Sequence, residues 1–189
     1  FLKTNNPGES EIKKFIETVN ASDVEVFCLM DYWTFDWYMA VKKYVATNPI
    51  LNKTIFSGME LRIECAVDYR LNIHVLLSDE LTEQQLKDFK SALKIRIGTT
   101  LKSVSDEALL TFAKSLDASK ARSHGYADPN TLTDPQCIQL GSRTAEVTRD
   151  SLTDAFKTIP VDSGYILLPY DTSDGLLNLD WSRHPHDDN

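Results

Sequence analysis

The chain has 189 residues, of which 42% are hydrophobic and 25% charged, values typical of a globular domain and not of a disordered or fibrous chain. No run approaches the roughly 18 apolar residues that a membrane-spanning helix needs. The net charge of −8 argues against broad, non-specific nucleic-acid binding, because such binding depends on neutralising phosphates. A local basic patch is still compatible with this total.

The cysteines and the N-terminus indicate an intracellular protein. Cys28, Cys65 and Cys137 are widely spaced, so they predict neither a disulfide framework nor a zinc knuckle. The first residues are too polar for a signal peptide, and reduced thiols fit a cytosolic or nuclear setting. Because the sequence does not begin with Met, we expect it to be cut from a longer chain.

The first half of the chain predicts helices alternating with strands. Residues 9–19 carry apolar side chains at helical spacing, and residues 24–30 are a short apolar run typical of a buried strand. Residues 33–46 predict an aromatic-rich helix, which packs on a sheet more often than it forms a base-stacking platform. Residues 59–77 alternate twice around Asp68-Tyr69 and predict a hairpin.

The second half predicts mainly helices. Residues 82–97 and 106–116 are amphipathic, residues 118–143 are polar with little periodicity and predict a long loop, and residues 150–159 predict another helix. Residues 165–169 fit a strand or a helix. The expected fold is α+β, with a single mainly antiparallel sheet and helices packed on its faces. Residues 1–181 form one domain, and residues 182–189 a flexible tail.

The register of the predicted hairpin follows from its apolar alternation. Paired apolar residues must share one side of a sheet. Pairing Val67 with Leu71, and so on outward to Leu61 with Leu77, aligns all of them and leaves the three-residue loop 68–70, a common hairpin length.

The opposite face of the hairpin is polar. It carries Glu60, Arg62, Glu64, Asn72 and His74, and this register places Glu64 opposite His74 with Asn72 one pleat away. Oxygen and imidazole ligands together suit Mg²⁺ or Mn²⁺. The alternative is an ordinary solvent-facing surface pair, because half-exposed strands usually carry polar residues on their outer side.

The segment 63–77 resembles part of a known family. It is similar to the replication-initiator nuclease domain at the N-terminus of the large non-structural (Rep) protein of parvoviruses, one of the HUH endonucleases. In that family a glutamate and two histidines flanking a hydrophobic residue hold a divalent metal. Glu64 matches the glutamate and His74 the second histidine, whereas Asn72 stands where the first histidine would be.

A second segment, 162–169, resembles the nucleophile motif of the same family. The resemblance implies that Tyr165 is the catalytic nucleophile, although Tyr170 stands where the family has a lysine that positions the scissile phosphate. The chain contains no GxxxxGK[ST] phosphate loop, so the helicase half of that family is missing, as expected for an N-terminal fragment.

The resemblance implies a viral, HUH-like domain that binds origin DNA in the host nucleus. It would nick a single strand by metal-dependent tyrosine transesterification, with Mg²⁺ or Mn²⁺ as cofactor and with single-stranded and duplex origin DNA as partners. It implies no membrane partner, and an oligomer only when the domain belongs to a longer helicase-containing chain. Two alternatives are a domain of the same fold that binds DNA or a partner without cutting, and an unrelated acidic interaction protein.

Basic side chains for phosphate contact gather on the predicted helix 82–97 and in the polar segment 118–143. A cluster of this kind can grip a DNA backbone in spite of an acidic total, although a solvated helix face explains any single lysine equally well. The main candidates are Lys87, Lys90, Lys94, Arg96, Lys120 and Arg122, and further basic residues near them are Lys102, Lys114 and Arg143.

Overall fold

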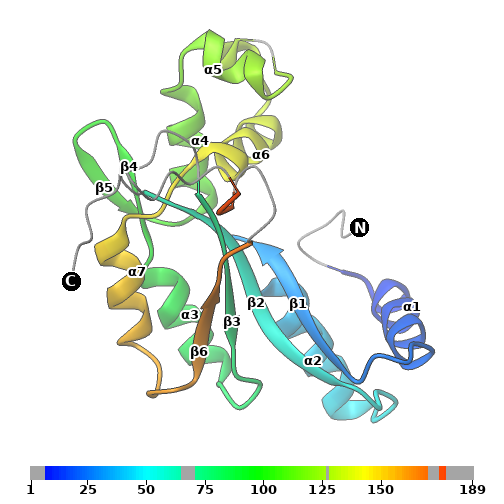
Figure 1. Cartoon of the computed structure of the whole chain (residues 1–189). Helices are drawn as coiled ribbons and strands as arrows, with labels where there is room; N and C mark the ends of the chain where they lie inside the picture. The colour runs from blue at the N-terminus through cyan, green and yellow to red at the C-terminus, as the bar shows by residue number, and fades with distance from the viewer. Residues whose placement is uncertain (1–6, 65–70, 127, 170–174, 178–189) are drawn as a thin grey trace.

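The computed structural model describes residues 7–64, 71–126, 128–169 and 175–177, and it has an α+β fold. Its main sheet has the strand order β1-β2-β3-β6 (Figure 1). Strand β1 (Val26–Tyr32) pairs in parallel with β2 (Thr54–Ile63). The pairs of β2 with β3 (Leu71–Leu77) and of β3 with β6 (Gly164–Leu167) are antiparallel, so the sheet is mixed.

The parallel pair results from a helical crossover. Helix α1 (Glu9–Asn20) precedes β1, and helix α2 (Asp36–Thr47) connects β1 to β2. Parallel neighbours need such a connection, because a short turn can only return the chain antiparallel. The sequence predicted these two helices and β1, but it did not predict the first half of β2.

One face of the main sheet is buried under three helices. Side chains of β2 and β3, among them Met59, Leu61 and Val75, share a core with α2, α3 (Glu83–Ala92) and α7 (Arg149–Phe156). In Figure 1 the strands β1 and β2 lie in front of α2. We call the opposite side of the four strands the open face.

The predicted aromatic helix is confirmed as core. Trp33, Phe35, Trp37 and Tyr38 are all buried, and the rings of Phe15 and Trp37 meet edge to face at a centroid distance of 6.3 Å. Their faces are therefore closed to a nucleic-acid base, and the base-stacking platform is ruled out.

The last residues of the predicted helix 82–97 form a short strand instead of a helix. Its start is confirmed by a capping box between Thr82 and Gln85, but α3 ends at Ala92. Strand β4 (Lys94–Ile97) then pairs with β5 (Thr100–Ser103). The strand is favoured over a continued helix because Ile95 of β4 also forms a β-bridge with Val147. Val147 bridges in turn to Ile63, so the β4-β5 hairpin is connected to the end of β2.

The long loop predicted for residues 118–143 is wrong. The segment contains α5 (Ala118–Ser123), a 3₁₀ turn η1 (Pro129–Thr131) and most of α6 (Asp134–Thr144), which packs against α4 (Asp106–Lys114). A small second core joins them through Ala113, Ala121, Cys137 and Leu140. Small residues carry little hydropathy, so the helical periodicity was not visible in the sequence.

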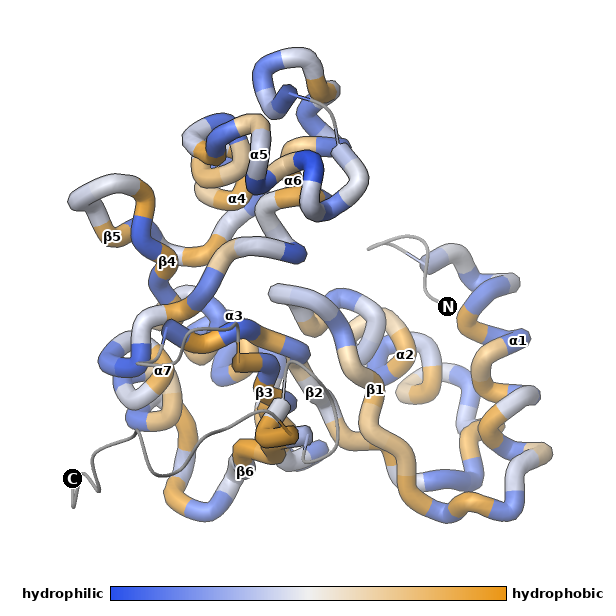
Figure 2. The backbone as a smooth tube through the Cα atoms, turned by 45° about the horizontal axis from the view of Figure 1, so that its top comes forward, coloured by the Kyte–Doolittle hydropathy of each residue, from blue (hydrophilic) through white to orange (hydrophobic). Residues whose placement is uncertain are grey.

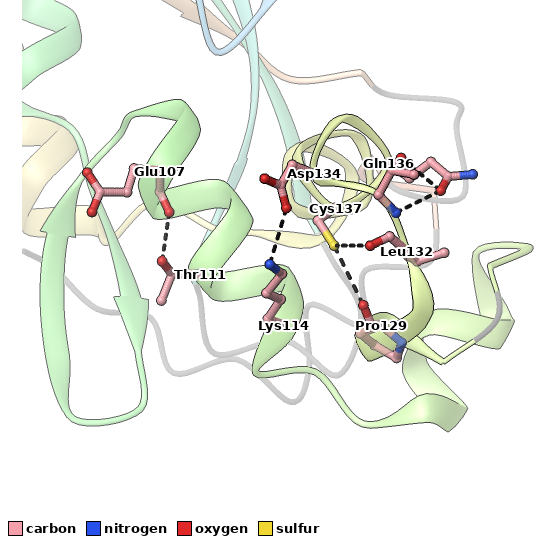
Figure 3. A network of polar contacts seen from close by, with 9 residues as sticks. Glu107, Thr111, Lys114, Pro129, Leu132, Asp134, Gln136 and Cys137 are labelled. Carbon is pink, nitrogen blue, oxygen red and sulfur yellow. Dashed lines mark hydrogen bonds and ion pairs between the residues drawn. The ribbon is translucent and has the colours of Figure 1, made fainter.

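Figure 3 shows the polar contacts that hold this helical lobe together. Lys114 Nζ lies 3.2 Å from a carboxylate oxygen of Asp134, an ion pair between α4 and α6. The Cys137 thiol donates to the carbonyl oxygen of Pro129 at 3.6 Å, which ties α6 to η1. Cys137 is thus a buried structural thiol of the lobe.

Candidate functional site

The hairpin register differs from the one expected from the sequence. Glu60, and not Glu64, lies opposite His74, and Arg62 lies opposite Asn72. Strand β2 leaves β3 at Ile63, because the Glu64 amide donates to the Val147 carbonyl. Residues 65–70, including the expected loop 68–70, lie outside the described part of the chain.

The physical reason is that alternation determines the face of a strand but not its register. Every slip by an even number of residues keeps the apolar side chains on one side. The contact with Val147 and a longer connection between β2 and β3 select one of these registers. Glu64 then pairs with Arg96, with 3.4 Å between a carboxylate oxygen and the guanidinium Nε.

The open face carries three neighbouring rows of side chains, read across the sheet. One row contains Tyr32, Glu60, His74 and Leu167. Arg62 and Asn72 form the row on one side of it, and a row ending in Tyr165 lies on the other side. Because directly opposed residues share a face, all of these side chains emerge from the same surface.

Glu60 is held by two hydrogen bonds. The Tyr32 hydroxyl and the Asn72 side-chain amide both donate to its Oε1 atom, each at 2.7 Å. Cβ atoms of directly opposed residues such as Glu60 and His74 are about 4.5–5.5 Å apart. The carboxylate is therefore oriented, and it stands next to an imidazole.

Asn72 has an oxygen that is not satisfied. The residue is only 6% exposed, and its Oδ1 atom is buried without a hydrogen-bond partner among the described residues. An unpaired buried polar atom costs free energy, so a ligand that accepts its lone pairs would be favoured there. Glu60, Asn72 and His74 together offer the oxygen and nitrogen atoms that Mg²⁺ or Mn²⁺ accepts.

The side chains that could ligate a metal on this face are a pair and not a larger cluster. Among the described residues, no three His, Cys, Asp or Glu side chains come together in a way that could hold an ion. Glu60 and His74 could offer a carboxylate and an imidazole to an ion, and Asn72 an amide. This donor set is weaker for transition metals than one with two histidines.

The pKa of the Tyr32 hydroxyl is shifted by the charged groups around it. Burial, the hydrogen bond to Glu60 and the negative charge of Glu60 together raise the pKa of the Tyr32 hydroxyl to about 12, whereas the positive charges of Arg62 and Arg143 lower it. Tyr32 stays a protonated donor at neutral pH and holds Glu60 in place.

Tyr165 lies on the same face as Glu60 and His74. Tyr165 is 63% exposed, and its side chain lies on the same face of the sheet as that of Leu76, its partner on β3. Diagonal neighbours on adjacent strands are roughly 7–8 Å apart, and His74 and Tyr165 have this relation. Tyr165 belongs to a hydrophobic edge strand, visible in Figure 2 as the orange tube at β6. Tyr170 lies outside the described residues.

The basic residues expected to bind DNA are dispersed over the molecule. Lys87 and Lys90 lie on α3, which covers the buried face of the sheet. The other main candidates belong to β4 and α5: Lys94, Arg96, Lys120 and Arg122. The structure does not bring them together with Glu60 and His74.

Sequence reasoning missed Glu60, Tyr32 and Arg62 as members of the site, and it considered Arg143 only as a candidate for phosphate contact from the polar segment. Glu60 and Arg62 were assigned to the correct polar face, and the alternation that begins at Thr54 was the only signal that β2 started earlier. Tyr32 and Arg143 come from β1 and α6, and nothing in the sequence connects them with the hairpin.

No family model, curated protein or solved structure matches the chain. None of the helices in the described part of the chain has the length and apolar character needed to cross a membrane. The side chains on the open face are therefore the basis for a functional proposal.

Proposed function

We propose that the open face binds single-stranded DNA and nicks it by metal-dependent transesterification, as the resemblance to parvovirus initiator nucleases implies. The observation that carries the proposal is the grouping of Glu60, His74 and the buried, unsatisfied Oδ1 of Asn72 on one face of the sheet. The exposed Tyr165 stands one row away.

Glu60, Asn72 and His74 would hold the divalent cation. Glu60 replaces Glu64 in this role, because Glu64 is engaged by Arg96. The Asn72 amide donates to one carboxylate oxygen through its nitrogen and leaves its own oxygen available. When bound, the ion supplies charge stabilisation to a phosphate oxygen.

Tyr165 would be the nucleophile. Its hydroxyl oxygen forms a bond to the phosphorus of a backbone phosphate, the bond from that phosphorus to the 3′ oxygen breaks, and the 3′ oxygen takes up a proton. The DNA 5′ end then stays attached to the protein. A tyrosine needs activation for this step, because its ordinary pKa is near 10.

The test measures both parts of the proposal. We expect labelled single-stranded origin-like oligonucleotides to be cleaved with Mn²⁺ and to leave a covalent adduct, which Tyr165→Phe abolishes and Tyr126→Phe, in the helical lobe, retains. By calorimetry, Glu60→Gln should weaken Mn²⁺ binding about tenfold or more, and Glu64→Gln less than about twofold.

The results that contradict the proposal are equally definite. If the Tyr165→Phe variant still cleaves the oligonucleotide, Tyr165 is not the nucleophile. If Mn²⁺ binding depends on Glu64 and not on Glu60, the proposed set of metal ligands is wrong. The observed register makes the two glutamates a matched pair for this purpose, because both lie on β2 or at its end.

A second candidate is a domain of the same fold that binds DNA or a partner without cutting DNA. The observation that favours it is that Asn72 offers an amide where the family has an imidazole. In that case the protein binds the oligonucleotide without cleavage, and Asn72→His restores the adduct at Tyr165. If neither binding nor rescue is found, the acidic interaction protein is the remaining reading.

A further inference from the structure

Two arginines stand beside the candidate cation site on the open face. Arg62 lies on β2 directly opposite Asn72, in the row next to Glu60 and His74. Arg143 lies near the end of α6, and its positive charge reaches the Tyr32 hydroxyl together with that of Arg62. The two arginines are 81 positions apart in the sequence, and the fold brings them together.

The approach of α6 to the sheet is fixed by one hydrogen bond. Trp33 Nε1 donates to the Ser142 carbonyl oxygen at 2.6 Å. Trp33 directly follows β1 and Ser142 directly precedes Arg143, so this bond holds the arginine next to the end of β1. Because Trp33 is buried, the contact is part of the core and not a surface accident.

The Nε atom of Arg62 is not satisfied. It is buried, and it has no hydrogen-bond partner within the described residues. A guanidinium donor that has lost water and gained no acceptor favours an anion that can reach it. Arg143 is exposed, so it remains accessible to an incoming ligand.

We propose that Arg62 and Arg143 bind a phosphodiester of single-stranded DNA beside Glu60 and His74. The planar guanidinium donates two parallel N–H groups to one phosphate, which suits this role better than a lysine. The inference rests on the proposed function for the identity of its ligand and deepens it.

The two arginines bring positive charge next to Glu60. The chain as a whole carries −8, so phosphate contact on this protein depends on local groups of this kind. Local positive charge is what directs a phosphate to one place on an acidic protein.

The experiment measures oligonucleotide binding in EDTA, where no divalent cation contributes. Fluorescence anisotropy is followed with a labelled single-stranded 15-mer as the probe and the full chain as the partner. We expect the double variant Arg62→Gln, Arg143→Gln to raise the Kd about tenfold or more at low salt. The slope of log K against log salt should fall by about 0.7, because the two arginines contact one phosphate and each phosphate contact on single strands contributes about 0.7.

The matched control is Lys87→Gln, Lys90→Gln, which removes the same charge from α3, on the other side of the sheet. It should change the Kd less than about twofold. The wild type should also bind a 15-mer with uncharged methylphosphonate linkages more weakly than the ordinary strand. Arg143→Gln alone repeats the test on an exposed residue, in case the substitution of Arg62 lowers the melting temperature.

Equal Kd values for the two double variants would overturn the inference, and so would equal binding of the charged and uncharged strands. The result is separable from the nuclease proposal. DNA binding that depends on the arginines without any cleavage in Mn²⁺ supports the inference and rejects nicking. Cleavage that depends on Tyr165, together with DNA binding that does not depend on the arginines, supports nicking and rejects the inference.

Discussion

Asp31 is a carboxyl group that the fold places in the core. It lies on β1 opposite Met59, it is 7% exposed, and it accepts a hydrogen bond from the backbone amide of Trp37 at 3.2 Å. Burial raises the pKa of Asp31 from 3.8 to about 6, and the hydrogen bond only partly opposes this shift. The residue anchors the first turn of α2 to the sheet, at a cost in charge burial.

The sign of the pH dependence follows from that shift. The folded state holds the Asp31 proton more tightly than the unfolded state, so the free energy of unfolding falls as pH rises from about 4 to about 6. We expect Asp31→Asn to remove this part of the dependence, which amounts to at most about 3 kcal/mol. Urea unfolding from pH 4 to 7 measures it, and parallel curves for the two proteins would contradict it.

Glu60 and Glu64 show how a residue-scale prediction can find the polar face of a strand and still be wrong about which residue lies opposite His74. Both carboxylates lie on or next to one polar strand, and the resemblance assigned the metal to Glu64. The hydrogen bonds from Tyr32 and Asn72 go to Glu60. Neither donor could be placed before the register was known.

At the scale of elements, helices α4 and α6 approach each other unusually closely. A Cβ atom at Gly141 would lie 2.3 Å from the carbonyl oxygen of Leu109, a backbone atom that cannot turn away. Only glycine allows this crossing. The second core and the position of Arg143 both depend on this close crossing, because Cys137, Leu140 and Arg143 all belong to α6.

Gly141→Ala is therefore expected to separate the two helices. We expect a loss of about 1–3 kcal/mol in the free energy of unfolding, typical of overpacking, while Ser142→Ala, on the same helix, changes it by less than about 0.5 kcal/mol. Thermal and urea unfolding of both variants provide the measurement. Equal stability of the two would show that the helices do not cross at this glycine.

Helix starts were more predictable than helix ends. Thr82 and Gln85 form a capping box that is local in sequence, and the predicted start at residue 82 is confirmed. The capping box of Thr133 and Gln136 is equally local, but that segment was predicted to be a loop. The end of α3 depends instead on the bridge between Ile95 and Val147, which are distant in the chain. A local pattern cannot contain a partner that arrives later in the sequence.

At the scale of the whole molecule, Phe89 connects the layers. Its ring meets Phe35 and Phe156 edge to face, at centroid distances of 6.2 and 5.3 Å, so it joins the start of α2 to α3 and α7. It is fully buried. The helical layer under the sheet is thus organised around one side chain.

Phe89→Ala is expected to destabilise the protein by about 3–5 kcal/mol, because it removes a large buried ring and leaves a cavity. Val161→Ala, at a residue that is 89% exposed, should change stability by less than about 0.5 kcal/mol. Chemical denaturation measures both. A loss below about 1 kcal/mol at Phe89 would mean that the helices pack on the sheet independently of this ring.

The sequence by itself determined the α+β class, the buried aromatic helix, the hairpin and the polar character of one of its faces. These features follow from hydropathy that alternates within a few residues, which a local pattern records completely. Tyr165 and His74 were also selected from short motifs, and their roles are still to be tested.

Only the tertiary structure decided which side chains meet. The parallel pairing of β1 with β2 brings Tyr32 to Glu60, and the contact of Val147 with the end of β2 sets the register. Trp33 and Ser142 bring Arg143 to the same surface from α6. Contacts of this kind depend on packing between distant segments, and alternation is unchanged by an even slip of a strand.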